Sequence, residues 1–315
     1  MLDIRRLRYF LTTVEEGSFS RAAQRLNVAQ PALSLHVHKM EEALGVRLLF
    51  RGSKGVVPTE EGALLALRAR TLLADLEQTE DEIRSFGKEP AGTVRLGLPG
   101  TISHILSVPL ITRCRARYPG IKIIVAEAMS GFVREWLVAR SVELAVIYLD
   151  LQGEGLISEA LLEEELVLLT PPGSKQGTGE VSLDYLAGKD LILPSEAHGL
   201  RIMLKKLFDA RGLAAEPAIE LDSYGNIKRL VEAGYGYSIL PLHAVAEDER
   251  AGRLSVRHFI DPRLSRRAYM IRDISRPTTR ATLIVCSVLK DLVADLIEDG
   301  TWLGARLVDG QSMGK

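Results

Sequence analysis

Residues 18–58 read SFSRAAQRLNVAQPALSLHVHKMEEALGVRLLFRGSKGVVP, and this stretch decides the fold of the first part of the chain. Two helical patterns, expected at residues 19–26 and 30–44, are separated by a tight connection and followed by a basic, glycine-containing hairpin. A further helical pattern precedes them at residues 4–16. Such an order places one helix in the major groove of DNA and a wing on the neighbouring phosphates. The sequence therefore predicts a winged helix-turn-helix.

The helix at residues 30–44 can be oriented from its apolar spacing. Leu33, Val37, Met40 and Leu44 recur at intervals of 4, 3 and 4, which predicts one buried stripe. The other faces are then free for DNA: Gln30 for a base edge, Leu35 for a thymine methyl group, and His38 with Lys39 for phosphates. The expected DNA-binding residues are Ser18 (also a good N-cap), Gln30, Pro31, Ser34, Leu35, His38 and Lys39, with Arg51 and Lys54 in the wing.

The alternative for the wing is an ordinary solvated loop, as for most Lys/Gly turns. Its position directly behind a helix-turn-helix favours a phosphate-binding hairpin, with Arg51 and Lys54 supplying the charge.

Composition and charge bound the class of protein. At 315 residues, with 46% hydrophobic and 26% charged residues, the chain is globular in composition and long enough for two or three domains. A net charge of −1 argues against a protein that coats nucleic acid over its whole surface. The charge is uneven, because residues 1–60 hold nine Lys and Arg against six Asp and Glu. This basic end fits a local contact with DNA.

The sequence offers little for catalysis, metal binding or membranes. The N-terminus lacks a signal-peptide core, and no run approaches the roughly 20 apolar residues of a membrane span, so we expect a cytoplasmic protein with no membrane partner. P-loop, Gly-x-Ser-x-Gly and HExxH motifs are missing, and the six histidines form no ligand-spaced pair in the second part of the chain. Cys114 is expected to be a core thiol rather than a redox sensor. We expect no enzyme activity, catalytic residue, metal or cofactor.

The chain resembles the LysR-type transcriptional regulators of bacteria over its whole length, strongly to about Gly62 and more loosely beyond. The residues that fall at the family's spacing are Ala22-Ala23, Leu26, Gln30-Pro31-Ala32-Leu33-Ser34, Glu41, Leu44-Gly45, Arg51 and Thr59…Gly62. The chain departs from the usual pattern at Leu48-Leu49-Phe50-Arg51, where the family has Leu-Phe-x-Arg, and at Leu35-His36, where many members have two polar residues. These departures concern the operator that is read, not DNA binding. The resemblance implies double-stranded promoter DNA and RNA polymerase as partners.

A long helix is predicted at residues 59–86, where Gly62 is the sole glycine and proline is missing. The positions Leu65, Ala69, Leu72, Leu76, Thr79, Ile83 and Phe86 alternate in steps of 4 and 3, the period of a two-chain coiled-coil seam. The alternative is packing within one chain. The resemblance implies dimerisation through this helix, so we expect a homodimer or homotetramer with Leu65, Ala69, Leu72, Leu76 and Ile83 in the interface.

Beyond residue 93, strand and helix patterns alternate, which predicts open α/β sheets that bind a ligand beyond the carboxyl ends of their strands. The chain is expected to cross between two lobes near residues 162–170 and again near 267–272. Two lobes joined by two strands enclose a cleft, as in periplasmic binding proteins, and the resemblance implies this layout for the effector-binding domain.

Several polar side chains are expected to face this cleft. Arg201 is the one guanidinium among them and would take a carboxylate bidentately, so we expect a small carboxylate or comparable anion as effector. The alternatives are N-capping for each Ser or Thr and a surface ion pair for Arg201. The expected effector-binding residues are Gly100, Thr101, Ile102 and Ser103 at a helix N-terminus, then Met129, Ser130, Tyr148, Ser195, His198, Arg201 and Ser223.

These patterns predict an effector-modulated, sequence-specific transcription regulator. A small-molecule carrier or enzyme that uses its N-terminal helices only to oligomerise is the alternative, and it would need neither the basic wing nor the polar face from Gln30 to Ser34. The expected parts are residues 1–58 (winged helix-turn-helix), 59–87 (linker and dimerisation helix), 88–92 (hinge), 93–164 with 268–300 (first lobe), 165–267 (second lobe) and 301–315 (C-terminal tail).

Overall fold

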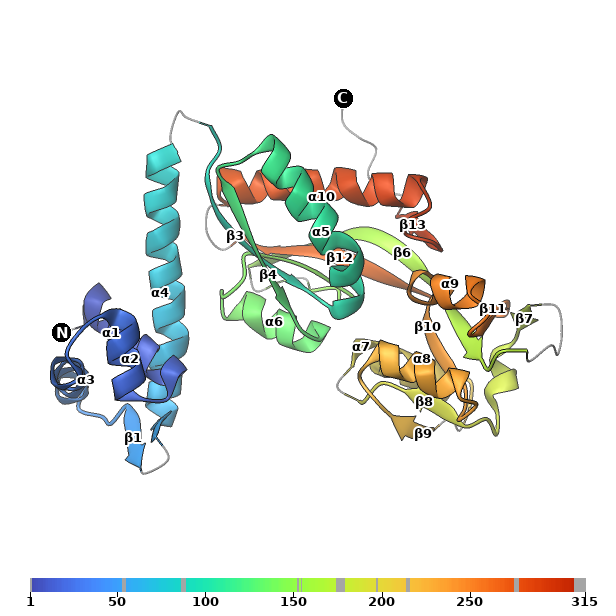
Figure 1. Cartoon of the computed structure of the whole chain (residues 1–315), viewed down its shortest axis with the longest axis horizontal. Helices are drawn as coiled ribbons and strands as arrows, with labels where there is room; N and C mark the ends of the chain where they lie inside the picture. The colour runs from blue at the N-terminus through green and yellow to red at the C-terminus, as the bar shows by residue number, and fades with distance from the viewer. Residues whose placement is uncertain are drawn as a thin grey trace. The chain divides into compact units, whose positions relative to one another are not determined.

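The computed structural model describes residues 2–52, 55–85, 89–151, 153, 155–173, 179–196, 198–213, 216–274 and 278–308. The chain divides into two compact units, which are described separately below (Figure 1). The first runs to Gly92 and includes Val138–Ser141, and the second comprises the rest of the described chain.

The first unit opens with three helices at the predicted positions: α1 (Ile4–Glu16), α2 (Phe19–Leu26) and α3 (Gln30–Leu44). Their ends have local causes. The Asp3 carboxylate accepts a hydrogen bond from the Arg6 amide at 2.8 Å and caps α1. Left-handed residues then end each helix: Gly17 (φ 57°), Asn27 (φ 53°) and Gly45 (φ 70°).

The apolar stripe of α3 is confirmed for three of its four members. Leu33, Val37 and Met40 are fully buried in the core of the unit, with Phe10 of α1. Leu44 is 42% exposed, so its assignment to the stripe is wrong. It occupies the last turn of α3, and the chain leaves the helix at the next residue.

The wing is a two-stranded antiparallel hairpin, β1 (Leu49–Gly52) and β2 (Gly55–Pro58), in which Phe50 lies opposite Val57. One carboxylate ties it to α3, because Glu41 Oε1 accepts hydrogen bonds from the Leu48 amide at 2.9 Å and the Leu49 amide at 3.2 Å. Glu41 thereby satisfies two backbone donors at the start of the hairpin.

Helix α4 (Glu60–Ser85) starts where Thr59 Oγ1 accepts from the Gly62 amide at 3.0 Å and donates to the Arg47 carbonyl at 2.8 Å. A Cβ at Gly62 would overlap the carbonyl oxygen of Leu48, so this close approach requires glycine. Further along α4, Ala66 and Leu73 are buried in the core of the same unit.

The buried face of α4 corrects part of the expected dimer seam. Ala69 is fully buried in the core of its own unit, and Leu65 packs against that core. Both therefore serve the alternative, packing within one chain. Leu72 and Ile83 are 56% and 71% exposed, and Leu76 is half-buried, so these three remain available for a second chain.

The first lobe of the second unit is built on a sheet in the order β4-β3-β5-β12-β6, in which β12 is Ser265–Asp273 and β6 is Leu156–Thr170; β13 also pairs with β6. Its apolar faces are covered on both sides: α5 and α10 pack on one, α6 on the other (Figure 1). The elements are β3 (Gly92–Leu98), α5 (Gly100–Arg117), β4 (Ile121–Glu127), α6 (Ser130–Val138), β5 (Leu144–Ile147), α10 (Arg280–Glu298) and β13 (Ala305–Leu307).

The second lobe has its own apolar core, formed by residues between 166 and 264. Strands β10 and β11 pair antiparallel with the far end of β6, and β7 pairs with β11. The elements are β7 (Glu180–Val181), a 3-10 turn (Leu183–Leu186), β8 (Leu191–Leu193), α7 (Gly199–Ala210), β9 (Pro217–Glu220), α8 (Tyr224–Glu232), β10 (Ser238–Pro241), α9 (Leu242–Arg250) and β11 (Ser255–Phe259).

Two long strands connect the lobes, β6 (Leu156–Thr170) and β12 (Ser265–Asp273). They pair antiparallel with each other over the whole of β12, and β6 then continues into the second lobe. These are the two crossing segments that the sequence predicts, and they make a two-lobed α/β unit.

The expected C-terminal tail is wrong for residues 301–307. Trp302 is buried in the core of the first lobe, and β13 pairs with β6 opposite Leu162 and Glu164. The large apolar side chain of Trp302, just after the charged residues that end the last helix, is the sequence feature that could have indicated burial of this segment. In the described part of the chain, no helix is long and apolar enough to cross a membrane.

Candidate functional site

The exposed side of α3 and the first wing strand enclose a groove of about 1120 Å³. Six of the predicted DNA-binding residues line it together: Gln30, Pro31, Ser34, Leu35, His38 and Arg51. An open groove with an amide, a hydroxyl, an imidazole and a guanidinium suits base edges and phosphates.

Arg51 organises this groove from the wing. Its Nη1 donates to Ser34 Oγ at 3.0 Å, and its guanidinium carbon lies 4.7 Å from the centre of the Phe19 ring. A longer contact of 3.9 Å reaches the Glu41 carboxylate. These contacts hold the Arg51 guanidinium beside the exposed face of α3, so its positive charge lies next to the hydrogen-bonding side chains of that face.

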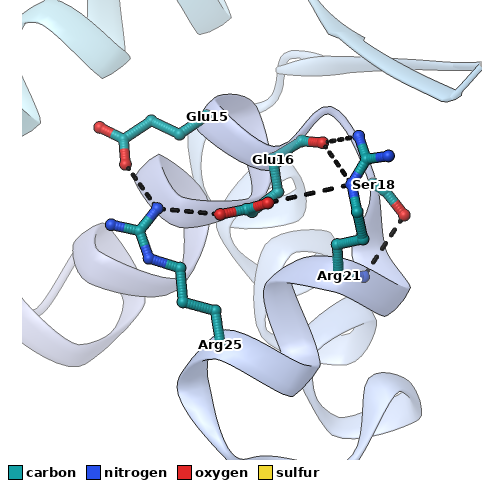
Figure 2. Close-up of polar contacts among 5 residues, drawn as sticks. All are labelled: Glu15, Glu16, Ser18, Arg21 and Arg25. Atoms are coloured by element: carbon teal, nitrogen blue, oxygen red, sulfur yellow. Dashed lines mark hydrogen bonds and ion pairs between the residues drawn. The ribbon is translucent and has the colours of Figure 1, made fainter.

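A separate polar network joins α1 to α2 and uses two arginines of the basic end (Figure 2). Arg25 Nη1 contacts the carboxylates of Glu15 at 3.4 Å and Glu16 at 3.0 Å, while Arg21 donates to the Glu16 carbonyl through Nε at 3.1 Å and through Nη2. The positive charge of these arginines is therefore offset locally.

Two predicted DNA-binding residues, Ser18 and Lys39, lie outside the groove lining. Ser18 is the N-cap of α2, with its hydroxyl accepting from the Arg21 amide at 3.4 Å, which is the role that the N-cap pattern indicated. Lys39 is exposed on α3 but does not line the groove. Lys54 lies outside the described residues. Sequence reasoning missed Arg47 and Phe50, which are exposed and line the groove, because a basic residue and an aromatic before the hairpin tip carry no spacing signal of their own.

The second unit contains a cleft of about 590 Å³ lined by residues of both lobes. Five of the predicted effector-binding residues line it: Gly100, Thr101, Met129, His198 and Ser223. They belong to strand ends and helix starts, as the rule for open α/β sheets predicts.

The expectation that Arg201 faces the cleft is wrong. Its side chain is 2% exposed within α7, and its Nη2 lies 3.1 Å from the Glu216 carboxylate. Arg201 lies in the first turn of α7, next to Leu200 and one turn before Leu204 on the buried face, which turns it inward. An ion pair was the stated alternative.

Five further predicted residues do not line the cleft, for different reasons. Ile102 is part of the first lobe's core, and Ser103 Oγ contacts Ser107 Oγ at 2.9 Å within α5. Ser130 is buried at the start of α6. Ser195 is bonded to Asp222 through its amide at 2.9 Å and its hydroxyl at 3.0 Å. Tyr148 is also absent from the lining, although its hydroxyl lies 3.2 Å from Oγ1 of Thr101, which does line the cleft.

The cleft lining also contains charged residues that sequence reasoning missed. Lys228 is held in place, with Nζ 2.6 Å from the Asp248 carboxylate and donating to the Ala244 carbonyl at 3.0 Å. These residues come from four separate segments, so no spacing within one stretch of sequence identifies the set. They are His104, Glu127, Asp222, Tyr224, Lys228, His243 and Glu247.

His198 presents a defined hydrogen-bond donor. Its Nδ1 accepts from the Leu200 amide at 3.2 Å as the N-cap of α7. Burial, and after it the charge of Arg266, lowers the pKa of His198 to about 4. The Asp222 carboxylate opposes this shift but does not cancel it. The ring is therefore neutral at physiological pH, and with Nδ1 accepting, the proton resides on Nε2.

A buried ion pair joins the two crossing strands near the cleft. Arg266 Nη2 lies 2.6 Å from Glu164 Oε1, and the Trp302 indole donates to Glu164 Oε2 at 3.1 Å. The Arg266 guanidinium also stacks 3.5 Å from the centre of the Tyr148 ring. Burial opposes ionisation of Glu164, but the Arg266 charge and the hydrogen bonds from Arg266 and Trp302 outweigh it and hold the pKa of Glu164 below the usual range.

The thiols take no part in either site. Cys114 is buried in the core of the first lobe, which confirms the expectation of a core thiol, and burial raises the pKa of Cys286 to about 11. Among the described residues, no group of three His, Cys, Asp or Glu side chains is placed to hold a metal ion.

A winged helix-turn-helix with a polar groove, followed by a two-lobed α/β unit with a cleft, defines a DNA-binding protein with a ligand-binding domain. Residues 4–63 match the family described as "Bacterial regulatory helix-turn-helix protein, lysR family", and residues 87–293 match the "LysR substrate binding domain". The chain belongs to the LysR family of transcriptional regulators.

Individual relatives agree with this assignment. The nitrogen assimilation regulatory protein nac of Escherichia coli K12 is 34% identical over 242 residues, 76% of this chain and 78% of that protein. A full-length OxyR variant from Pseudomonas aeruginosa has a TM-score of 0.73 at 24% identity, covering 99% of each chain. CbnR in complex with its target DNA has a TM-score of 0.70 at 21% identity, covering 93% of this chain and 99% of that one. At these identities the two structures show the shared fold.

Proposed function

We propose that this chain is an effector-gated regulator whose contacts with promoter DNA change when a small organic acid binds in the cleft of the second unit. The observation that carries the proposal is the pairing, in one chain, of a polar groove along α3 with a ligand-sized cleft between two lobes. Self-association through α4 presents two such grooves to a near-palindromic DNA site. RNA polymerase is the protein partner whose activity at the promoter then changes.

The DNA contacts are proposed from the groove residues. Gln30 at the start of α3 suits an adenine edge, Leu35 a thymine methyl group, and Arg51 the phosphates beside the wing. Ser20 Oγ donates to Gln30 Oε1 at 3.3 Å, which leaves the amide NH₂ of Gln30 free to turn toward a base. Arg47 adds a second cation at the groove.

The acid group of the effector is proposed to bind at the start of α5 rather than at Arg201. Pro99 occupies the N-cap position and provides no side-chain cap, so the first backbone N–H groups of the helix are free for a ligand where Gly100 and Thr101 line the cleft. The Nε2–H of His198 is a further donor in the lining.

Footprinting tests the proposal on the DNA upstream of the chain's own gene, with and without a panel of small organic acids. We expect a protected region whose extent changes with one class of acid. Gln30→Ala should abolish protection, whereas Arg201→Ala, in an ion pair outside both sites, should keep both protection and the acid response. Protection that survives Gln30→Ala, or that no acid alters, contradicts the DNA contacts or the gating, respectively.

A further inference from the structure

Two groups of opposite electrostatic character stand side by side at the start of α5. The helix offers the free N–H groups of its first turn, because Pro99 cannot cap it. Directly beside them, Glu127 Oε1 lies 3.1 Å from the place where a Cβ on Gly100 would be. Both Gly100 and Glu127 line the cleft.

The Glu127 carboxylate is available to a ligand. It ends β4, is exposed, and makes no hydrogen bond or ion pair with any residue in the described part of the chain. A simple anion bound at the α5 N-terminus would lie against this carboxylate and be repelled by it. The site therefore favours a ligand that carries a positive charge next to its negative one.

The charges around the rest of the cleft point the same way. Three carboxylates line it, those of Glu127, Asp222 and Glu247, against the single ammonium of Lys228. That ammonium lies 2.6 Å from the Asp248 carboxylate, which offsets its charge. A purely anionic ligand thus meets a lining with an excess of negative charge.

Two buried polar groups of the lining have hydrogen-bonding capacity left for a ligand. The His243 side chain is 5% exposed and lines the cleft; its Nδ1 lies 3.4 Å from Glu164 Oε2, and neither ring nitrogen completes a hydrogen bond with a described residue. The Tyr224 hydroxyl, also in the lining, is buried near the Arg266 guanidinium and likewise completes no hydrogen bond among the described residues. Buried polar groups are normally satisfied, so both side chains can take a ligand or solvent atom as a hydrogen-bond partner.

We propose that the cleft recognises the head group of an α-amino acid. This inference rests on the proposed function and deepens it by naming the effector class. The carboxylate of the ligand binds the free N–H groups at the start of α5, and its ammonium group binds Glu127. In an α-amino acid these groups are attached to one carbon, so one ligand can reach the helix N–H groups and the adjacent carboxylate together. Tyr224 and His243 then contact the remaining polar atoms of the ligand.

Isothermal titration of the full chain with matched ligand sets tests this inference. Each α-amino acid is compared with its des-amino carboxylic acid and its N-acetyl derivative, which keep the carboxylate but remove the positive charge. We expect at least one amino acid to bind roughly tenfold or more tightly than either relative, since it alone pairs with Glu127. Glu127→Gln should abolish that preference, and Glu298→Gln, an exposed carboxylate at the end of α10, should keep it.

The outcomes separate this inference from the proposed function. Equal binding of amino and des-amino acids overturns the amino-acid inference while the small-acid effector stands. Binding of amines without a carboxylate at the same strength overturns the inference as well, because α5 would then play no part. If no member of either set binds to a chain that still protects its DNA, the inference and the proposed acid effector both fall.

Discussion

Arg266 and Glu164 form a buried ion pair, 2.6 Å apart, at directly opposed positions of the two strands that connect the lobes. Side chains of both lobes close around it: Trp302 and Tyr148 from the first, His243 and Tyr224 from the second. Because Tyr224 and His243 also line the cleft, the pair connects the strand crossing to the ligand site.

Removing one partner of this pair should destabilise the second unit strongly. Arg266→Met leaves a buried carboxylate without its counter-charge, a change that typically costs about 3–5 kcal/mol. The double variant Arg266→Met/Glu164→Leu removes both charges and should recover most of that loss. Urea denaturation followed by the fluorescence of buried Trp302 measures both variants.

The neighbouring residue is a matched control. Arg267 lies on the same strand, but its side chain is exposed and pairs with Glu163 at the surface. Arg267→Met should leave the urea midpoint unchanged within error. A loss for Arg267→Met as large as that for Arg266→Met would show that burial of the pair is not the cause.

The depressed pKa of His198 predicts a pH dependence of stability. The folded ring has a pKa of about 4, against an unfolded value near ~6.5, so the unfolded chain binds more protons between these values. The unfolding free energy should therefore fall as pH drops from about 6.5 toward 4, with His198 contributing at most about 3 kcal/mol.

His198→Asn isolates this contribution. Asn keeps an acceptor for the Leu200 amide at the start of α7 but does not titrate. The variant should unfold with a similar free energy to the natural chain at pH 7.5 and lose less stability by pH 4.5. Urea midpoints at both pH values measure the difference. Parallel losses in the two proteins would mean that other groups carry the pH dependence.

The DNA-binding unit is the part that the sequence predicted most fully, because its signals are local. The apolar spacing predicted the three helices, Ser18 predicted the start of α2, and the glycine-containing turn predicted the hairpin. Leu44 was wrongly assigned to the buried stripe, because periodicity alone does not show where a helix extends beyond the core against which it packs. Ala69 was misplaced because a 3–4 spacing fits the core of one chain as well as a seam between two.

The cleft was predicted less well, because its chemistry depends on which segments meet. The strand-end rule found Gly100, Thr101, Met129, His198 and Ser223, yet it gave no information on side-chain direction. Arg201 therefore looked like an anion ligand until its burial beside Glu216 was seen. Lys228 escaped notice because it lies along a helix, and His243, two residues after the end of β10, was not among the strand ends considered.

Gly62 should tolerate no side chain. In Gly62→Ala the new methyl group would overlap the Leu48 carbonyl, and backbone must move to relieve it. We expect a loss of about 2 kcal/mol or more in the stability of the first unit, seen as a lower melting temperature together with weaker DNA binding. Gly131→Ala in α6 is the control, since nothing lies within 4 Å of its Cβ position, and it should be neutral or slightly stabilising.

Arg51 should contribute charge to DNA binding and Arg25 should not. Arg51→Ala is expected to weaken binding to specific and unrelated DNA alike and to reduce the salt slope of the binding constant by about 1. Arg51→Lys keeps the charge but loses the geometry toward Ser34 and Phe19, so it should keep the salt slope and bind more weakly. Arg25→Ala, whose partners are Glu15 and Glu16, should leave the slope unchanged. Fluorescence anisotropy over a range of salt concentrations measures all three.

The exposed part of α4 should hold two chains together. Leu72 and Ile83 project from this helix, whereas Ala69 is fully buried in its own unit. Leu72→Glu/Ile83→Glu should therefore lower the sedimentation coefficient from that of a dimer or tetramer while the helical circular dichroism is retained. Ala69→Leu should instead overpack the core, with a loss of about 1–3 kcal/mol and no direct effect on assembly. Ile260→Glu, an exposed apolar position in the second lobe, is the control and should sediment as the natural chain does. If the double glutamate variant still sediments with the natural chain, α4 is not the element that joins the copies.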